Sequence, residues 1–196
     1  MLSARPIALR RGLAGVTMLE VLITLVILAF GLLGLAGLQV KIQTLNLESY
    51  QRAQAILILR DMVERIKANS ANAASYVPAS ASTMYGTGYT ATCPGTTQVG
   101  KDICEWSNAL QGAAESSSGT RVGAMIGARG CIQQITAPDA STGVCQPGVY
   151  RVTVAWQGVY ATSAPALACG SGQYGTDEAI RRAISGDIVV GLPSCL

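Results

Sequence analysis

The sequence predicts an α+β fold in which one long N-terminal helix packs on an antiparallel β-sheet with disulfide-stapled loops. Three observations lead to this prediction. Residues 16–38 form an apolar run with a single charge, and residues 39–68 continue it with helical periodicity. Residues 69–196 then turn to Gly, Ser and Thr and contain one clearly alternating strand together with all six cysteines.

The apolar run, residues 16–38, is long enough to cross a membrane. As a helix rising 1.5 Å per residue it would span roughly 34 Å. Arg5, Arg10 and Arg11 precede it. Because cytoplasmic flanks of membrane helices are rich in Lys and Arg, we expect the N-terminus to remain in the cytoplasm and everything after Gln39 to face the other side.

Glu20 is the unusual residue of this run, since a carboxylate in the apolar part of a membrane helix costs on the order of 2.5–3.5 kcal/mol on insertion scales. A secretory signal peptide cut between Ala36 and Gly37, or a plain uncleaved anchor, leaves that charge unexplained. A cut between Gly15 and Val16 would instead free an amino group four residues before Glu20. The new ammonium and the carboxylate could then neutralise each other, within one helix or between neighbouring ones.

The stretch "GVTMLEVLITLVILAFG", residues 15–31, resembles the class III signal of type IV pilins and pseudopilins. In that family a basic leader ends in Gly and Glu is the fifth residue after the cut; Val16 stands where Phe is usual. The resemblance implies that a membrane aspartic prepilin peptidase removes the leader, residues 1–15, and methylates the new N-terminus at Val16. It also implies that Val16 and Glu20 set the register between neighbouring subunits, in a pilin-like fold.

Gly31, Gly34 and Gly37 end the apolar run. Each glycine weakens a helix by roughly 1 kcal/mol relative to Ala, so this is where the helix is expected to bend or unwind. In a plain anchor the same glycines would only let helices approach closely. The resemblance to pilins implies that the stretch extends when subunits leave the lipid and pack in a filament.

Residues 39–68 are predicted to form an amphipathic stalk helix. Its apolar or small residues recur at steps of three and four, at Ile42, Leu45, Ser49, Ala53, Ile56, Leu59, Val63 and Ile66. Two i,i+4 ion pairs are expected on its surface, Glu48 with Arg52 and Asp61 with Arg65. Leu57 and Ile58 lie off the stripe and are expected to widen the buried face. One continuous helix and two helices separated at the glycines both fit this pattern.

Residues 69–196 are predicted to form an exported, β-rich globular domain, entered through a loop that ends at Pro78. The clearest strand is "GVYRVTVAWQG", residues 148–158, and a partner strand is expected at 130–136 after a turn-rich connection. A third strand is expected near 187–192, with a bulge at Gly186. A sheet laid over the stalk buries the apolar faces of both, which would make Tyr150 and Trp156 core residues.

The cysteines are Cys93, Cys104, Cys131, Cys145, Cys169 and Cys195. No two are spaced Cys-x-x-Cys, the pattern of zinc and thioredoxin-like sites, and an even number on the exported side indicates disulfides. Six cysteines allow fifteen pairings, which the spacing alone does not decide. We expect sequence neighbours to pair, Cys93 with Cys104, Cys131 with Cys145 and Cys169 with Cys195.

Composition argues against catalysis and against nucleic-acid binding. The leader arginines account for the whole formal charge of +3, so the rest of the chain lacks the basic surface that binds phosphates. The chain has no His, which excludes histidine acid/base chemistry and His-ligated metals. "CGSGQYGTDE", residues 169–178, lacks the alternating carboxylates of a calcium loop. We expect no metal, no cofactor and no enzymatic activity, and a chain that is the substrate of a peptidase.

Four stretches resemble minor pilins of type IV pili: "AFGLLGLAGLQ", "DMVERIKANSANAASY", "YRVTVAWQG" and "CGSGQYGTDEAIRRAIS". The resemblance implies a low-abundance subunit that joins other minor pilins and the major pilin, primes assembly and sits at the pilus tip, where it meets a large adhesin. It implies a single-pass protein of the bacterial inner membrane, in contact with lipid, whose periplasmic body later becomes extracellular. The alternatives are a pseudopilin of a type II secretion system and a soluble periplasmic protein with an ordinary signal peptide.

Overall fold

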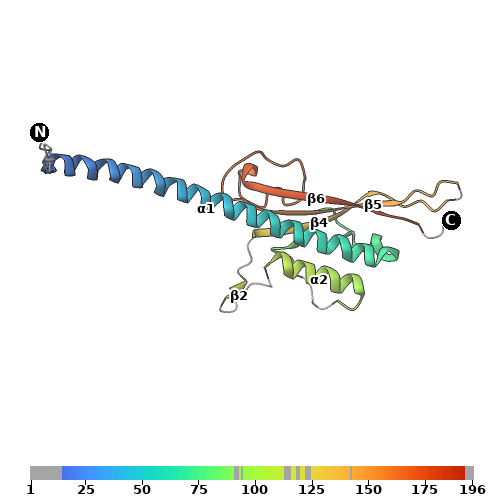
Figure 1. Ribbon diagram of the computed structural model, residues 1–196. Helices are drawn as coiled ribbons and strands as arrows, with labels where there is room; N and C mark the ends of the chain where they lie inside the picture. Colours follow the sequence, from blue (N-terminus) through green and yellow to red (C-terminus); the bar gives the residue numbers. More distant parts are fainter. Residues whose placement is uncertain are drawn as a thin grey trace, which may run out of the picture. The chain divides into compact units, whose positions relative to one another are not determined.

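The computed structural model describes residues 15–90, 93, 95–112, 116–117, 120–121, 125–141 and 143–192. The chain divides into two compact units, Met1–Thr44 and Leu45–Leu196. One helix, α1 (Met18–Ala68), begins in the first unit and ends in the second (Figure 1). Its 51 residues run without a break past the three glycines, so the single-helix alternative is the one that this structure adopts.

The second unit contains the end of α1, a second helix and a sheet of four antiparallel strands in the order β1-β4-β5-β6. Its further elements are η1 (Ser70–Tyr76), β1 (Tyr85–Gly86), α2 (Gln98–Leu110), β2 (Ser116–Ser117), β3 (Thr120–Arg121), β4 (Ile126–Thr136), β5 (Gly148–Gln157), η2 (Glu178–Ile180) and β6 (Arg181–Val190). The short β2 and β3 pair only with each other. The predicted α+β architecture is confirmed.

The sheet confirms the three predicted strands and corrects one detail. β4 and β5 form the predicted antiparallel pair, and β6 begins at Arg181, six residues before the expected start. The predicted bulge at Gly186 is wrong, because Gly186 pairs in register with Val152. Glycine stands there for a different reason: a Cβ on Gly186 would lie 3.0 Å from Cδ2 of Leu59, so the residue lets α1 approach the sheet closely.

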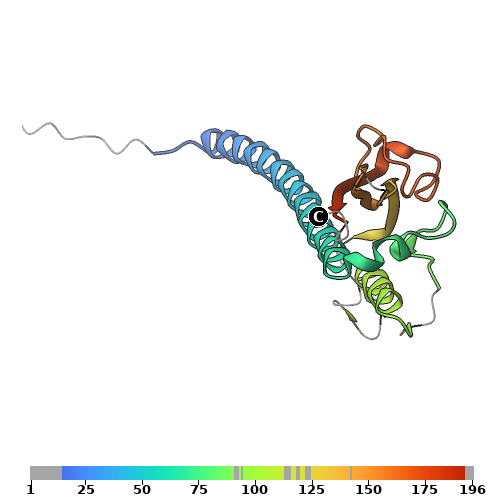
Figure 2. The same cartoon turned by 90° about the vertical axis from the view of Figure 1, so that its right-hand side faces the viewer.

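The two helices lie on one face of the sheet (Figure 2). Their buried side chains form one core with it. Tyr150 and Trp156 are in this core, as predicted. Trp106 of α2 is fully buried and its indole Nε1 donates to the carbonyl of Ile58 on α1 over 2.9 Å. This bond satisfies a polar group in the core and fixes α2 against α1.

The buried side of α1 is rotated from the predicted stripe. Its buried residues are Gln51, Ala55, Ile58, Leu59, Met62 and Ile66. Ser49, Ala53 and Ile56 of the predicted stripe are exposed, and Leu57 is 61% exposed. The buried side of this part of α1 includes a small residue and a polar one, Ala55 and Gln51, which a search for apolar spacing passes over.

Helix α2 is absent from the sequence-based expectations. Thr97 caps it, since the Thr97 side chain accepts from the Gly100 amide over 3.1 Å. Its buried Cys104, Trp106 and Leu110 give it the apolar side that packs on the rest of the second unit. The sequence does contain the signal, a Thr cap followed by apolar residues three and four apart, but within a segment rich in Gly, Ser and Thr.

Candidate functional site

The predicted processing site lies directly before α1. Gly15, Val16 and Thr17 are not helical, and the helix begins at Met18. The Glu20 amide donates to Thr17 Oγ1 over 3.3 Å, so Thr17 caps the helix and Glu20 stands in its first turn. Val16 is 68% exposed, and Gly15 is exposed as well. The predicted scissile bond is thus in an extended, accessible segment.

Glu20 has a possible role in capping its own helix, in addition to the predicted role in assembly. Thr-x-x-Glu at the start of a helix is the sequence of a capping box, in which the Glu side chain reaches back to the cap residue. The structure has one of the two bonds, the one from the Glu20 amide to Thr17. Among the described residues Glu20 makes no ion pair, so the charge predicted to need a partner has none in the part of the chain that the structure describes.

The first half of α1 has no buried side chain in the part that the structure describes. Every side chain from residue 15 to residue 43 is exposed, including Phe30 at 72% and Leu33 at 69%. In the described residues, α1 is the one helix long and apolar enough to cross a membrane by length and composition, a test that a signal sequence also passes. Soluble monomers rarely expose such a continuous apolar surface, so this segment needs lipid or other subunits around it.

The glycines are not required by the packing of this chain. A Cβ added at Gly31, Gly34 or Gly37 would meet no atom within 4 Å outside the local helix backbone, and none of the three has a positive φ. Alanine would therefore fit at each position and would favour the helix by about 1 kcal/mol.

Two threonines of α1 keep their hydroxyls satisfied within the helix. Thr24 Oγ1 donates to the Val21 carbonyl over 2.8 Å, and Thr44 Oγ1 donates to the Val40 carbonyl over 3.0 Å. A hydroxyl bonded to its own helix can face an apolar environment without an unpaired donor. Glu20 is consequently the one residue of the 16–38 run whose polar side chain lacks a hydrogen bond in the described structure.

In the second unit the two predicted stalk ion pairs have different outcomes. Asp61 pairs with Arg65 over 2.8 Å, as predicted. Glu48 does not pair with Arg52; it pairs with Arg182 of β6 over 3.2 Å and also accepts from the Val159 amide over 2.7 Å. A partner on the sheet, with both side chains about 15% exposed, replaces the exposed pair expected along the helix.

A polar cluster that the sequence did not reveal ties the end of α1 to η1 and α2. Asp102 of α2 is 4% exposed; its carboxylate accepts from the Tyr76 hydroxyl and from Arg65 Nη1, the latter over 3.1 Å. Arg65 also bonds Glu105 over 2.7 Å. Burial, and then the hydrogen bond to Asp102, raise the pKa of Tyr76 to about 12. Each member has its partners, so the cluster can stay buried at neutral pH.

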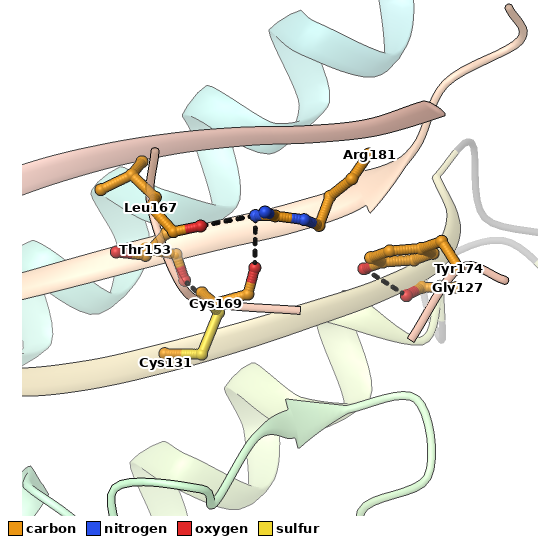
Figure 3. The surroundings of a disulfide bond; sticks show 7 residues. All are labelled: Gly127, Cys131, Thr153, Leu167, Cys169, Tyr174 and Arg181. Carbon is orange, nitrogen blue, oxygen red and sulfur yellow. Dashed lines mark hydrogen bonds between the residues drawn. A yellow bond between two sulfur atoms is a disulfide. The ribbon is translucent and has the colours of Figure 1, made fainter. Parts of the chain in front are cut away.

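The disulfides confirm one predicted pair and correct the other two. Cys93 is bonded to Cys104, as expected. Cys131 is bonded to Cys169 (Figure 3), so the expected Cys131–Cys145 and Cys169–Cys195 pairs are wrong. Cys145 is disulfide-bonded, and Cys195 lies outside the described residues.

Strand geometry explains why Cys131 cannot pair with its sequence neighbour. Cys131 lies opposite Thr153 in the middle of the β4–β5 pair, whereas Cys145 belongs to the connection beyond Gly148, at the end of that pair. A disulfide needs Cα atoms within about 7 Å. The segment between β5 and β6 instead returns over the second face of the sheet and brings Cys169 above β4 (Figure 3).

Arg181 holds this returning segment in place. Its guanidinium, 4% exposed, donates to the carbonyls of Leu167, Cys169 and Pro165 and pairs with Glu178. Tyr174 adds a bond from its hydroxyl to the Gly127 carbonyl over 3.0 Å. The second face of the sheet is thus covered by a loop fixed through both a disulfide and a buried cation.

The same loop accounts for Glu178, the carboxylate of the calcium-like stretch. Glu178 accepts from the Gly172 amide and from Arg181 Nε, so its oxygens serve the loop itself. Those two bonds lower the pKa of Glu178, the bond from Gly172 first. Among the residues that the structure describes, no group of three His, Cys, Asp or Glu side chains could hold a metal ion.

Comparison with known protein families gives one match. Residues 37–108 match the Tt1218-like family, described as type IV pilin Tt1218. The comparisons with curated proteins and with solved structures gave no match. The matched stretch runs from the middle of α1 into α2 and contains the whole part of α1 that packs on the sheet. The chain is thus similar to a type IV pilin family over this stretch, which adds to the long apolar helix and the α+β fold.

Proposed function

We propose that the chain is a minor pilin of a type IV pilus, made as a precursor and cut by a prepilin peptidase between Gly15 and Val16. The observation that carries the proposal is Glu20, a carboxylate without an ion pair among the described residues, in the part of α1 up to residue 43 whose side chains are all exposed. The match to a pilin family over residues 37–108 supports it from an independent part of the chain.

The proposed mechanism is electrostatic and takes place during assembly. Cleavage converts the amide nitrogen of Val16 into an ammonium, which the peptidase then methylates. This cation pairs with Glu20, and in lipid or in a filament core the pair is far more stable than either charge alone. Because both charges are at one end of the helix, the pairing fixes the vertical register of a subunit against its neighbour. Gly31, Gly34 and Gly37 supply the flexible stretch that lets the helix extend there.

Within the pilins the four quoted stretches look most like the minor pilin PilV, a type IV pilus modification protein. On this proposal the leader is residues 1–15, the membrane and filament-core helix 16–38, the stalk 39–68 and the periplasmic body 69–196. The subunit joins other minor pilins and the major pilin in the inner membrane, primes pilus assembly and ends at the tip, where it supports an adhesin, adhesion and twitching motility.

The test begins with the N-terminus of the mature protein, by sequencing or intact mass. A start at Val16, with one methyl group added, is expected; a start at Gly37 would contradict the proposal. Gly15→Leu should leave the precursor uncut in the membrane. Glu20→Ala should be cut and inserted normally yet fail to enter pili.

Thr17→Ala serves as the matched control for Glu20→Ala. It removes the helix cap but leaves the charges of Val16 and Glu20 in place. If Glu20 acts through the charge pair, Thr17→Ala should assemble nearly normally; equal loss in both variants would mean that Glu20 acts as a capping residue. Loss of exported enzymes in place of surface pili and twitching, on deletion, would favour a pseudopilin of a type II secretion system.

A further inference from the structure

A groove of about 340 Å³ lies in the second unit, between α1 and the sheet. Its lining includes Leu45, Ser49 and Arg52 of α1, Trp156 of β5, Ile184 of β6, and Tyr160 in the segment after β5. Leu45 is 45% exposed and Tyr160 is 41% exposed, so apolar surface borders the opening. The groove has a size and composition that suit one or two side chains of a partner protein.

The groove carries one positive charge that the described chain does not compensate. Glu48 and Arg182 also line it, but they neutralise each other, and Glu48 is further occupied by the Val159 amide. Arg52, the expected partner of Glu48, is exposed and makes no ion pair or hydrogen bond within the described residues. The unmatched cation beside apolar surface favours an incoming carboxylate.

A second donor without an acceptor lies in the same lining. Trp156 is 2% exposed, and its Nε1 has no hydrogen-bond partner among the described residues. An unpaired buried N–H of this kind costs about 1–3 kcal/mol. The lining therefore includes two donor side chains, Arg52 and Trp156, for which the described part of the chain supplies no acceptor.

The described part of the second unit has few carboxylates left to offer a second copy, and the proposed function assigns Glu20 of the first unit to the Val16 ammonium. In the described part of the second unit, Glu48, Asp61, Glu64, Asp102, Glu105, Glu178 and Asp187 are all in ion pairs. The remaining two, Asp139 and Asp177, accept backbone amides of their own loops. A carboxylate for Arg52 is thus better supplied by a different subunit than by another copy of this chain.

We infer that this groove docks a neighbouring pilus subunit of a different kind, through an acidic side chain that pairs with Arg52 and an adjacent apolar side chain that fills the space between Leu45 and Tyr160. The inference rests on the proposed function, which supplies the neighbouring subunits. It adds the chemistry of the contact: the partner surface is acidic and apolar, and the recognising cation is Arg52.

The experiment uses the full chain in cells that assemble pili, with a photo-activated benzophenone amino acid at Ser49, inside the groove. The cross-linked partner segment is identified by mass spectrometry and is expected to contain Asp or Glu. Arg52→Glu should reduce the cross-link about tenfold, because it turns an attraction into a repulsion. Reversing the mapped partner carboxylate to Lys should restore the cross-link to Arg52→Glu.

Arg60→Glu is the matched control, since Arg60 is an exposed arginine two helical turns further along α1 and outside the groove. It should change the cross-link less than twofold. Capture of a second copy, capture of a segment without carboxylates, or equal loss in both variants would overturn the inference.

A second probe at Ile23, in the apolar half of α1, separates this inference from the proposed function. If the Ile23 probe captures pilus subunits while the Ser49 probe captures none, the groove is not a docking site and the pilin role stands. If neither probe captures a pilus subunit, the proposed function fails, and the inference fails with it.

Discussion

The two halves of α1 have different surroundings in this structure: the first half is exposed, and the second half is partly buried against the rest of the second unit. In the first unit every side chain from residue 15 to residue 43 is exposed, and a Cβ added at Gly31, Gly34 or Gly37 would meet no atom outside the local helix backbone within 4 Å. In the second unit the same helix buries Ala55, Met62 and Ile66 completely and bonds to α2 and to the sheet. The second half of α1 serves the subunit's own stability, whereas the first half is proposed to contact partners, so substitutions in the two halves should affect different measurements.

The disulfide that crosses the second face of the sheet should give the largest loss of subunit stability. Cys131 and Cys169 are 38 residues apart, and closing such a loop contributes about 4 kcal/mol in the loop-entropy account. The double variant Cys131→Ser/Cys169→Ser should lower the free energy of unfolding by roughly this amount. Tryptophan fluorescence can follow the unfolding, since Trp106 and Trp156 are the only tryptophans and both are buried in the second unit.

Cys93→Ser/Cys104→Ser is the natural comparison for that disulfide. Its loop spans 11 residues, for which the same account gives about 3 kcal/mol. A larger loss from the short loop than from the long one would show that the segment between β5 and β6 is held mainly by Arg181. Glu20→Ala, in the first unit, should leave the fluorescence transition unchanged.

Gly130→Ala should have the next largest effect on the second unit. A Cβ at Gly130 of β4 would lie 2.2 Å from Cη2 of Trp106 and 2.8 Å from Cδ1 of Leu110, so α2 would have to move. Overpacking of this kind typically costs 1–3 kcal/mol, and the rigid indole places this site at about 3 kcal/mol. Urea unfolding measures the loss; an unchanged midpoint would mean that α2 is not held firmly against the sheet.

Tyr76→Phe should cost less, about 2 kcal/mol, because it leaves one buried oxygen of Asp102 without its donor. It should also change the response to alkali. A raised folded-state pKa means that the tyrosine contributes stability below its unfolded pKa, near 10, and that this stability is lost as pH rises toward about 12. Melting temperatures from pH 8 to 12 should fall less steeply in Tyr76→Phe.

The alkaline loss should not vanish in that variant. Burial also raises the pKa values of Tyr85 and Tyr174 to about 12, and both residues remain. Identical pH profiles for the two proteins would show that Tyr76 does not titrate with unfolding.

The sequence predicted the first half of α1 better than the contacts of the second unit. Length and hydrophobicity are properties of residues 16–38 alone, so they sufficed to predict an apolar helix long enough to cross a membrane. The β4–β5 strands were found because alternation of side chains along a strand is a local property. The pairing of cysteines is not a local property. Cys169 bonds to Cys131 only because the segment after β5 folds back over the sheet.

The sequence-based prediction did not include the parts of the second unit in which polar or small residues are buried. The buried side of α1 includes Gln51 and Ala55, so it differs from the apolar stripe. Asp102 is buried with hydrogen bonds from Arg65 of α1 and Tyr76 of η1. Periodicity detects apolar residues, and charge spacing detects partners on one helix. Neither method can anticipate that Glu48 pairs with Arg182 rather than Arg52.

Gly34→Ala should have the smallest effect on the subunit, and for that reason it tests the division most directly. No atom lies within 4 Å of the added Cβ, and the helix gains about 1 kcal/mol in local propensity, so the fluorescence transition of the second unit should not change. If the glycines serve only this chain, assembly should be normal or slightly improved. If they serve a helix that extends or approaches its neighbours closely, Gly34→Ala should reduce incorporation into pili, measured by immunoblotting of sheared pili against membranes. Reduced incorporation with unchanged unfolding would mean that the sequence of the first half of α1 is selected for the filament and not for the fold.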